Sequence, residues 1–224
     1  MASSRCKCGE IDSPATGGAR TSVKRSTPAS KPSVSVKRTP HRPASALIAL
    51  LRGVNVGGHK KVPMSELREV LSGIGCRSVA TYIQSGNAVF SSDMMPEEAE
   101  TAIEQAISSR FGFAVAVVVR TLAGWRAYET ASVFAEAQTA RPHLLLLGLP
   151  KRPPRPDAAE KLRVYAKAGE QIEIVDDGIW IDFATAIGSS KLTPAVIDRI
   201  VGSTVTARNW TTVQKLGEMA RALD

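Results

Sequence analysis

The sequence predicts an α+β protein with a duplicated ferredoxin-like fold, in which the order β-α-β-β-α-β plus an extra helix occurs twice. Short apolar or β-prone runs alternate with segments whose apolar residues recur at helical spacing. Two pairs of short strands flank turn sequences, at residues 84–87 and 176–178. The order of elements repeats with little residue identity. The expected domains are residues 1–43, 44–132 and 133–224.

The positive charge lies mostly in the first of these segments. Residues 1–43 hold nine of the 29 Lys and Arg residues and two of the 21 Asp and Glu residues, so the rest carries a net charge of only +1. This segment has no Leu, Phe, Tyr or Trp, so we expect it to be disordered. It lacks the apolar region of a secretory signal. An N-terminal extension, including a misassigned start, is favoured over an organellar transit peptide.

The first half begins with an apolar run of the kind that forms a strand buried on both faces. Pro and Gly residues then mark the ends of two segments with apolar residues at helical spacing. The expected elements are a strand at 46–54, a helix at 63–74, a hairpin of strands at 79–83 and 88–91, a helix at 96–111, a strand at 114–120 and a short helix at 122–132.

The second half repeats this order. Its hairpin is marked by an Asp-Gly pair, a strong turn signal. Thr211 or Thr212 is expected to cap the last helix, and Ser189 or Ser190 the helix before it. The expected elements are a strand at 143–149, a helix at 157–168, strands at 171–175 and 179–183, a helix at 192–201, a strand at 204–208 and a helix at 211–223.

A β-α-β-β-α-β unit forms one antiparallel sheet with strand order 4-1-3-2 and both helices on one face. In that arrangement the end of the first strand and the turn between the second and third strands share an edge. We therefore expect the loop at residues 52–61 and the turn at 84–87 to be neighbours in space.

The loop at residues 52–61 is the leading candidate for a binding site. Glycines let backbone N–H groups converge on an anion, and Arg and Lys add positive charge. With the neighbouring turn, the candidate ligand-binding residues are Arg52, Asn55, Gly57, Gly58, Lys60, Lys61, Gln84, Ser85 and Asn87. The spacing matches neither a Walker motif nor a dinucleotide fingerprint. A tight turn with solvated lysines and an ordinary Ser-Gly-Asn hairpin are the alternatives.

Five further residues are secondary candidates. Ser190 and Lys191 precede a helix whose N-terminus could hold an anion, although capping explains the serine equally well. Arg208, Asn209 and Trp210 join a strand to the last helix, where the tryptophan is expected to be a core anchor, with ligand stacking as the alternative. The sequence contains no recognisable catalytic constellation.

Several classes of protein are disfavoured by composition. No run of about 18 apolar residues is present, so we expect no membrane segment. Cys6, Cys8 and Cys76 make no disulfide framework, which fits a reducing cytoplasm. The Cys-x-Cys pair lacks the further ligands of a metal site, so we predict neither a metal nor a cofactor.

Five motifs occur in order along the chain: Ala49-Leu50-Leu51-Arg52-Gly53-Val54-Asn55-Val56-Gly57-Gly58, Val62-Pro63-Met64 with Leu67, Tyr82-Ile83-Gln84-Ser85-Gly86-Asn87, Ser190-Lys191-Leu192, and Ala207-Arg208-Asn209-Trp210-Thr211-Thr212-Val213. Together they resemble a bacterial family called domain of unknown function 1697. The resemblance runs from Ala46 to the C-terminus. It implies a bacterial, cytoplasmic protein with a duplicated ferredoxin-like architecture, and it carries no activity. His59 stands where the family usually has a residue resembling lysine.

We therefore expect a small binding protein that holds a phosphate-bearing ligand, a nucleotide or nucleic acid, through the basic glycine-rich loop. The alternatives are an enzyme acting on a small phosphorylated substrate, and a structural or dimerisation module whose motifs fix the packing between the halves. The oligomeric state is left open. RNA binding on the sheet face is disfavoured, because Phe90 is the one aromatic residue on the central strands of the first half.

Overall fold

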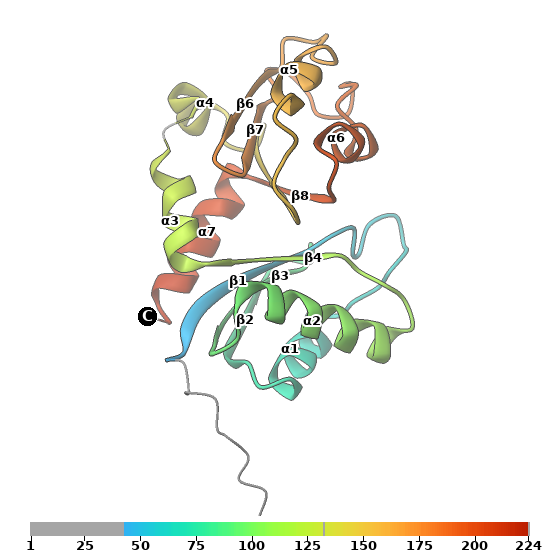
Figure 1. Ribbon diagram of the computed structural model, residues 1–224, viewed down its shortest axis with the longest axis vertical. Helices are drawn as coiled ribbons and strands as arrows, with labels where there is room; N and C mark the ends of the chain where they lie inside the picture. The colour runs from blue at the N-terminus through green and yellow to red at the C-terminus, as the bar shows by residue number, and fades with distance from the viewer. Residues whose placement is uncertain (1–42, 132, 224) are drawn as a thin grey trace, which may run out of the picture. The chain divides into compact units, whose positions relative to one another are not determined.

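The computed structural model describes residues 43–131 and 133–223, which contain two four-stranded antiparallel sheets and seven helices (Figure 1). The protein is therefore of the mixed α+β class. The disorder predicted for the N-terminal extension, and the cysteines Cys6 and Cys8, lie outside the described residues.

The first sheet has the strand order β2-β3-β1-β4, which is the order expected from the sequence. One of its faces is covered by two helices, whose residues Leu67 and Ile103 pack against Leu47 and Phe90. Phe90 is fully buried there, so it offers no exposed ring for RNA. The elements are β1 (Ser45–Leu51), α1 (Met64–Gly73), β2 (Arg77–Tyr82), β3 (Asn87–Ser92), α2 (Pro96–Phe111) and β4 (Val117–Thr121).

The second sheet has the equivalent order, β6-β7-β5-β8. Two helices again pack on one face, where Leu162 and Ile197 join Ile179, Ile181 and Phe183 in a separate core. The elements are β5 (Leu145–Pro150), α5 (Ala158–Arg163), β6 (Gln171–Val175), β7 (Gly178–Asp182), α6 (Pro194–Val201) and β8 (Val205–Asn209).

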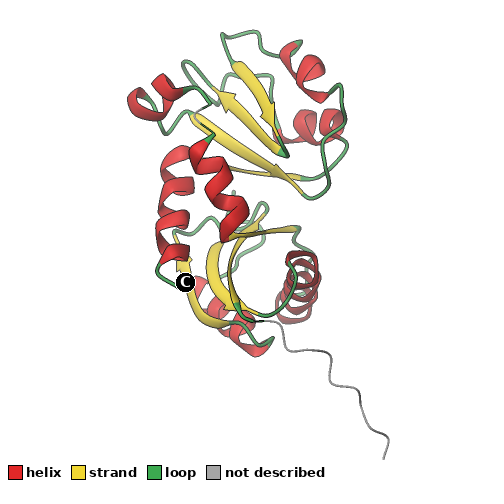
Figure 2. Ribbon diagram, turned by 60° about the vertical axis from the view of Figure 1, so that its left-hand side comes forward, coloured by secondary structure: helices red, strands yellow, loops and turns green. Residues whose placement is uncertain are grey.

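A third core is shared by the two halves and is built around α3 (Leu122–Thr130) and α7 (Trp210–Arg221). These helices run side by side (Figures 1 and 2), and α7 contacts β1 and β3 as well as β5 and β8. Trp125 and Trp210 meet apolar residues from both sheets, including Ile48 and Leu147. The second face of each sheet is thereby covered, which explains why β1 is buried on both faces as predicted.

The structure corrects several element boundaries. The first strand ends at Leu51 rather than residue 54, because Gly53 has a positive φ of 63° and the chain turns away from the sheet. The helix expected at 157–168 ends at Arg163, and a short helix, α4 (Ala135–Ala140), was not predicted.

Both predicted helix caps are wrong. The last helix begins at Trp210, so Asn209 rather than Thr211 or Thr212 accepts a hydrogen bond from the Thr212 N–H. Helix α6 begins two residues later than expected, with a proline in its first turn. Its cap is therefore Thr193, which accepts from the Val196 N–H, and not Ser189 or Ser190.

Candidate functional site

The glycine-rich loop and the β2–β3 turn are neighbours, as the topology predicts. The Asn55 side chain donates to the Gln84 carbonyl at 2.7 Å, and the Leu51 N–H donates to the Gly86 carbonyl at 2.8 Å. Asn55 also bonds the Val62 carbonyl and N–H, at 2.9 and 2.8 Å. The amide that was predicted to contact a ligand therefore fastens the loop to itself and to the turn.

The exposed part of the loop has the geometry of a tight turn. Gly57 and Gly58 both adopt positive φ, and the His59 N–H donates to the Val56 carbonyl at 3.1 Å. Lys60 reaches back to the Ala114 carbonyl at 2.8 Å, whereas Lys61 and Gln84 are exposed. The tight-turn alternative accounts for this arrangement without a ligand.

Arg208 connects the end of the chain with the first half. Its Nη2 donates to the carbonyls of Leu51 and Ser85, each at 2.8 Å, and its Nε donates to the Asn87 side chain. The structure thus brings the secondary candidate Arg208 to the predicted residues Ser85 and Asn87. All its hydrogen-bond partners among the described residues are neutral, and burial lowers the pKa of its guanidinium to about 10. Within residues 43–131 and 133–223, its positive charge therefore has no carboxylate partner.

Arg52 is engaged differently. Its Nη2 lies 2.9 Å from Asp198 Oδ2, its Nη1 donates to Asp198 Oδ1 at 3.0 Å, and it also bonds the Val205 carbonyl. Asp198 in turn accepts from the Val205 N–H at 2.9 Å. The charge of Arg52 is therefore already balanced, and this pair ties the loop after β1 to the edge strand β8.

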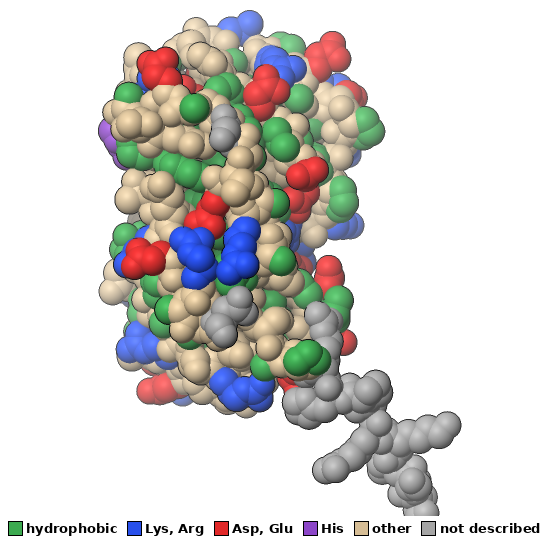
Figure 3. Space-filling view, turned by 90° about the vertical axis from the view of Figure 1, so that its left-hand side faces the viewer, with side chains coloured by type: hydrophobic (Ala, Val, Ile, Leu, Met, Phe, Trp, Pro, Cys, Tyr) green, Lys and Arg blue, Asp and Glu red, His purple; other side chains and the backbone are tan. Residues whose placement is uncertain are grey.

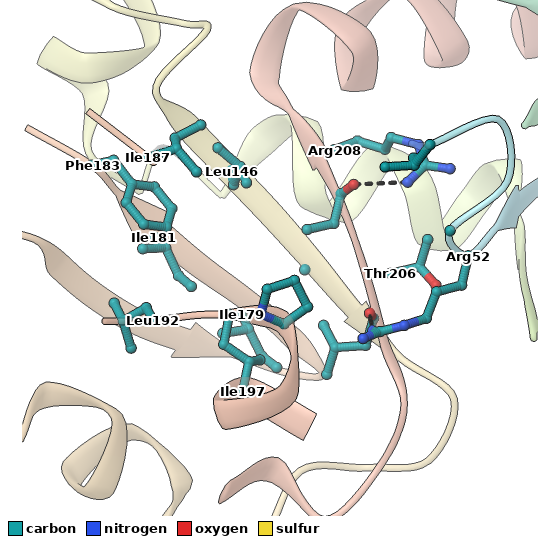
Figure 4. Close-up of a pocket in the computed structure, with 16 residues that line it drawn as sticks. Arg52, Leu146, Ile179, Ile181, Phe183, Ile187, Leu192, Ile197, Thr206 and Arg208 are labelled. Carbon is teal, nitrogen blue, oxygen red and sulfur yellow. Dashed lines mark hydrogen bonds between the residues drawn. The ribbon is translucent and has the colours of Figure 1, made fainter. Parts of the chain in front are cut away.

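Beside these arginines lies an apolar pocket of about 520 Å³, formed by β5, β7, β8, α6 and the segment before α6. Figure 4 shows Ile181, Phe183 and Leu192 towards one end of it and Arg52 and Arg208 at the other. Val56 and Ile187 also line it, and their side chains are unusually exposed for large apolar residues, at 65% and 44%. The pocket combines an apolar wall with one unbalanced positive charge.

Thr206 lines the same pocket from β8. It is 2% exposed, and its Oγ1 has no hydrogen-bond partner among the described residues. Leaving a buried hydroxyl unpaired costs about 1–3 kcal/mol. The strand that carries Arg208 therefore holds a second polar group that the fold leaves unsatisfied.

The other secondary candidates lie away from Arg208 or serve the fold. Ser190 donates to Glu170 and accepts from the Leu192 N–H at 3.1 Å, so it holds the segment before α6 in place. Lys191 is exposed. Trp210 is 4% exposed, with its ring 5.5 Å from that of Trp180 in the shared core. It is a core anchor, the first of the two roles considered for it.

A cluster of charged residues occupies the corresponding place in the first half. Arg120 donates to Asp177 at 2.8 Å and to the Pro150 carbonyl at 2.7 Å, and its Nη1 lies 3.8 Å from Glu100. Burial raises the pKa of Glu100, and burial with a hydrogen bond to Asp177 raises that of Tyr128 to about 12. Here the arginine faces carboxylates, in contrast to Arg208.

Sequence reasoning missed this correspondence and the pocket residues Thr206 and Pro194. One signal was present: the two segments that end the halves, Val117-Val118-Val119-Arg120-Thr121 and Val205-Thr206-Ala207-Arg208-Asn209, share the spacing of a valine, an arginine and a helix-capping residue. Comparing them identifies Arg120 and Arg208 as equivalents.

Few other features of the described residues suggest chemistry. No group of three or more His, Cys, Asp or Glu residues in them could hold a metal ion. None of their helices is both long and apolar enough to cross a membrane.

Cys76 is a buried free thiol, and burial raises the pKa of this thiol to about 11. On the face in Figure 3, basic and acidic side chains are interspersed, in keeping with the nearly neutral charge of this part of the chain.

The fold and the pocket define a small α+β protein with two four-stranded antiparallel sheets and an apolar cavity beside a half-buried arginine. The chain belongs to the family described as protein of unknown function (DUF1697), whose model matches residues 45–180.

Among solved structures, the chain is similar to the conserved bacterial protein SP0830 from Streptococcus pneumoniae, with a TM-score of 0.60 and 21% sequence identity. The similarity covers 79% of this chain and 99% of that one, and it shows a shared fold. No curated protein matches the chain.

Proposed function

We propose that this protein binds a small organic anion, with its apolar body in the pocket and its acid group at the Arg208 end. The observation that carries the proposal is the pairing of a largely apolar cavity of about 520 Å³ with the Arg208 guanidinium, whose partners in the described part of the chain are all neutral. Binding pockets for small molecules are mostly apolar with a few placed polar groups. An anion in this position would gain a charge-assisted hydrogen bond that water alone does not provide.

The proposed ligand site is therefore at the half-buried Arg208 rather than at the exposed lysines of the loop. A phosphate-bearing compound stays within the proposed class, together with organic carboxylates. Nucleic acid fits less well, because a pocket of this size cannot enclose a polymer. In addition, Phe90 on the central strands of the first sheet is buried and cannot stack on a base.

A structural module is the second candidate. It is favoured by the contacts of Arg52 with Asp198 and of Arg208 with Leu51 and Ser85, which join the two halves. The third candidate is an enzyme acting on a small phosphorylated substrate. Turnover of a compound that binds in the titration would support it.

We further propose that each half is a ferredoxin-like unit, with a boundary near residue 132. The equivalent strand orders and the placement of two helices on one face of each sheet support this. A bacterial, cytoplasmic setting belongs to the same proposal and is supported by the family resemblance and the low cysteine content.

The proposal is tested by titrating the full chain with octanoate, hexyl phosphate and the neutral octanol in a calorimeter. We expect one or both anions to bind and octanol to bind much more weakly. Equal affinity for octanol, or no heat with either anion, contradicts the proposal.

The double variant Lys60→Ala/Lys61→Ala separates the pocket from the loop. Both side chains are exposed and neither lines the pocket. We therefore expect this variant to bind the same anion within about twofold of the unaltered chain, since exposed charges act weakly through water. A loss of binding in this variant would return the site to the loop.

A further inference from the structure

The two halves exchange equivalent contacts through the arginine of their last strand. Arg120 in β4 donates to the carbonyl at the end of β5, Pro150, and Arg208 in β8 donates to the carbonyl at the end of β1, Leu51. Each arginine also donates through Nη1 to the carbonyl of the residue before it, at 2.9 Å for Arg120 and 2.8 Å for Arg208. The two guanidinium groups therefore occupy corresponding positions.

A carboxylate on the neighbouring helix corresponds in the same way. Glu104 in α2 accepts from the Val117 N–H at 2.9 Å and pairs with Lys151. Asp198 in α6 accepts from the Val205 N–H at 2.9 Å and pairs with Arg52. Glu104 and Asp198 are thus equivalents, and they align α2 with α6.

The two halves differ one helical turn before Glu104 and Asp198. In α2 this position is Glu100, which accepts from the Val119 N–H at 2.9 Å and lies 3.8 Å from Arg120 Nη1. In α6 it is Pro194, which has no acceptor in its side chain. The hairpin turn that each arginine meets differs too, because Arg120 meets Asp177 and Arg208 meets the neutral Asn87.

The position in the second half that corresponds to the Glu100 carboxylate lies in the pocket. The counterpart of Val119 is Ala207, and both Ala207 and Pro194 line the cavity. The Lys151 N–H donates to the Thr204 carbonyl, so the backbone groups of Thr204 face β5. Along an antiparallel strand, successive residues direct their backbone groups to opposite sides. The N–H of Ala207, three residues after Thr204, therefore points away from β5. A backbone donor and an unbalanced arginine therefore meet where the first half holds Glu100.

We propose that the ligand of this pocket is a monocarboxylate whose acid group takes the place that Glu100 has in the first half, accepting from the Ala207 N–H and balancing Arg208. This inference rests on the proposed function and deepens it by naming the acid group and its position. The apolar body of the ligand lies against Ile181 and Phe183, on the same wall of the pocket.

The charges at the site favour a carboxylate over a phosphate. Arg208 offers one positive charge, and Arg52 is already paired with Asp198. A carboxylate balances a single guanidinium, whereas a phosphate monoester carries up to two negative charges near neutral pH and would leave one unbalanced in a partly apolar site. The ligand is therefore a monoanion with an apolar tail.

Pro194→Glu tests the inference, because it supplies from the protein the carboxylate that the ligand is proposed to bring. We expect this variant to bind octanoate at least tenfold more weakly than the unaltered chain. Ala195→Glu is the matched control: it adds the same charge one residue along, at an exposed position outside the pocket, and is expected to keep its affinity. Equal affinity of Pro194→Glu and Ala195→Glu overturns the inference.

A second measurement needs no variant. In the unaltered chain, octanoate is expected to bind more tightly than hexyl phosphate and to shift the Ala207 amide proton downfield in the NMR spectrum. Preference for the phosphate, or an unchanged Ala207 amide at saturation, overturns the carboxylate assignment while leaving organic-anion binding intact. Binding of neither compound overturns both proposals.

Discussion

Replacing Gly86 with alanine tests how closely the β2–β3 turn packs under the loop. Gly86 has φ +74°, and an added Cβ would lie 2.5 Å from Val54 Cγ2 and 2.7 Å from Leu51 Cβ. The left-handed backbone costs an alanine about 1–2 kcal/mol, and overpacking costs about 1–3 kcal/mol more. We expect Gly86→Ala to lower the free energy of unfolding by about 2–5 kcal/mol, measured by urea denaturation.

Gly58→Ala is the matched control. Gly58 has a similar φ of +79°, but nothing lies within 4 Å of an added Cβ. This variant should therefore show the backbone cost of about 1–2 kcal/mol alone. If both variants lose the same stability, the close approach of Gly86 to Leu51 and Val54 is not what the turn requires, and the packing argument is refuted.

Two further predictions concern buried groups. Thr206→Val removes a hydroxyl that has no partner among the residues that the structure describes, and it introduces the residue type found at the equivalent Val118. We expect urea denaturation to show a gain in the free energy of unfolding of about 1 kcal/mol. A loss of stability would contradict the unpaired state of that hydroxyl. Burial raises the pKa of Cys76 from 9.0 to about 11, so its thiol contributes stability that is present below pH 9 and lost as the pH rises through 11. Relative to Cys76→Ala, the unaltered chain should lose about 2 kcal/mol of stability between these pH values, and parallel pH profiles of the two proteins would contradict this prediction.

The sequence was sufficient for the strands, for every helix except α4 and for the strand order, because local signals determine them. Apolar runs and turn residues located the strands, and the strand order placed residues 52–61 beside residues 84–87, as the bond from Asn55 to Gln84 confirms. Helix caps were less predictable, since Asn209 and the two threonines after it are all capable caps and the choice depends on where the helix begins.

The pocket could not be predicted, because it depends on partners distant in sequence. Arg52 resembled an anion-binding side chain, but Asp198, 146 residues away, balances it. The more informative residue was Arg208, and what distinguishes it from Arg120 is an absence: Pro194 stands where the first half has Glu100. No periodic pattern reveals a carboxylate that is missing.

A crystal structure of the full chain with octanoate would show directly where this protein holds an organic anion. We expect the carboxylate within hydrogen-bond distance of the Ala207 backbone nitrogen and beside Arg208, with the alkyl chain against Ile181 and Phe183. A carboxylate bound instead at Gly57 and Lys61, or outside the pocket altogether, would contradict it.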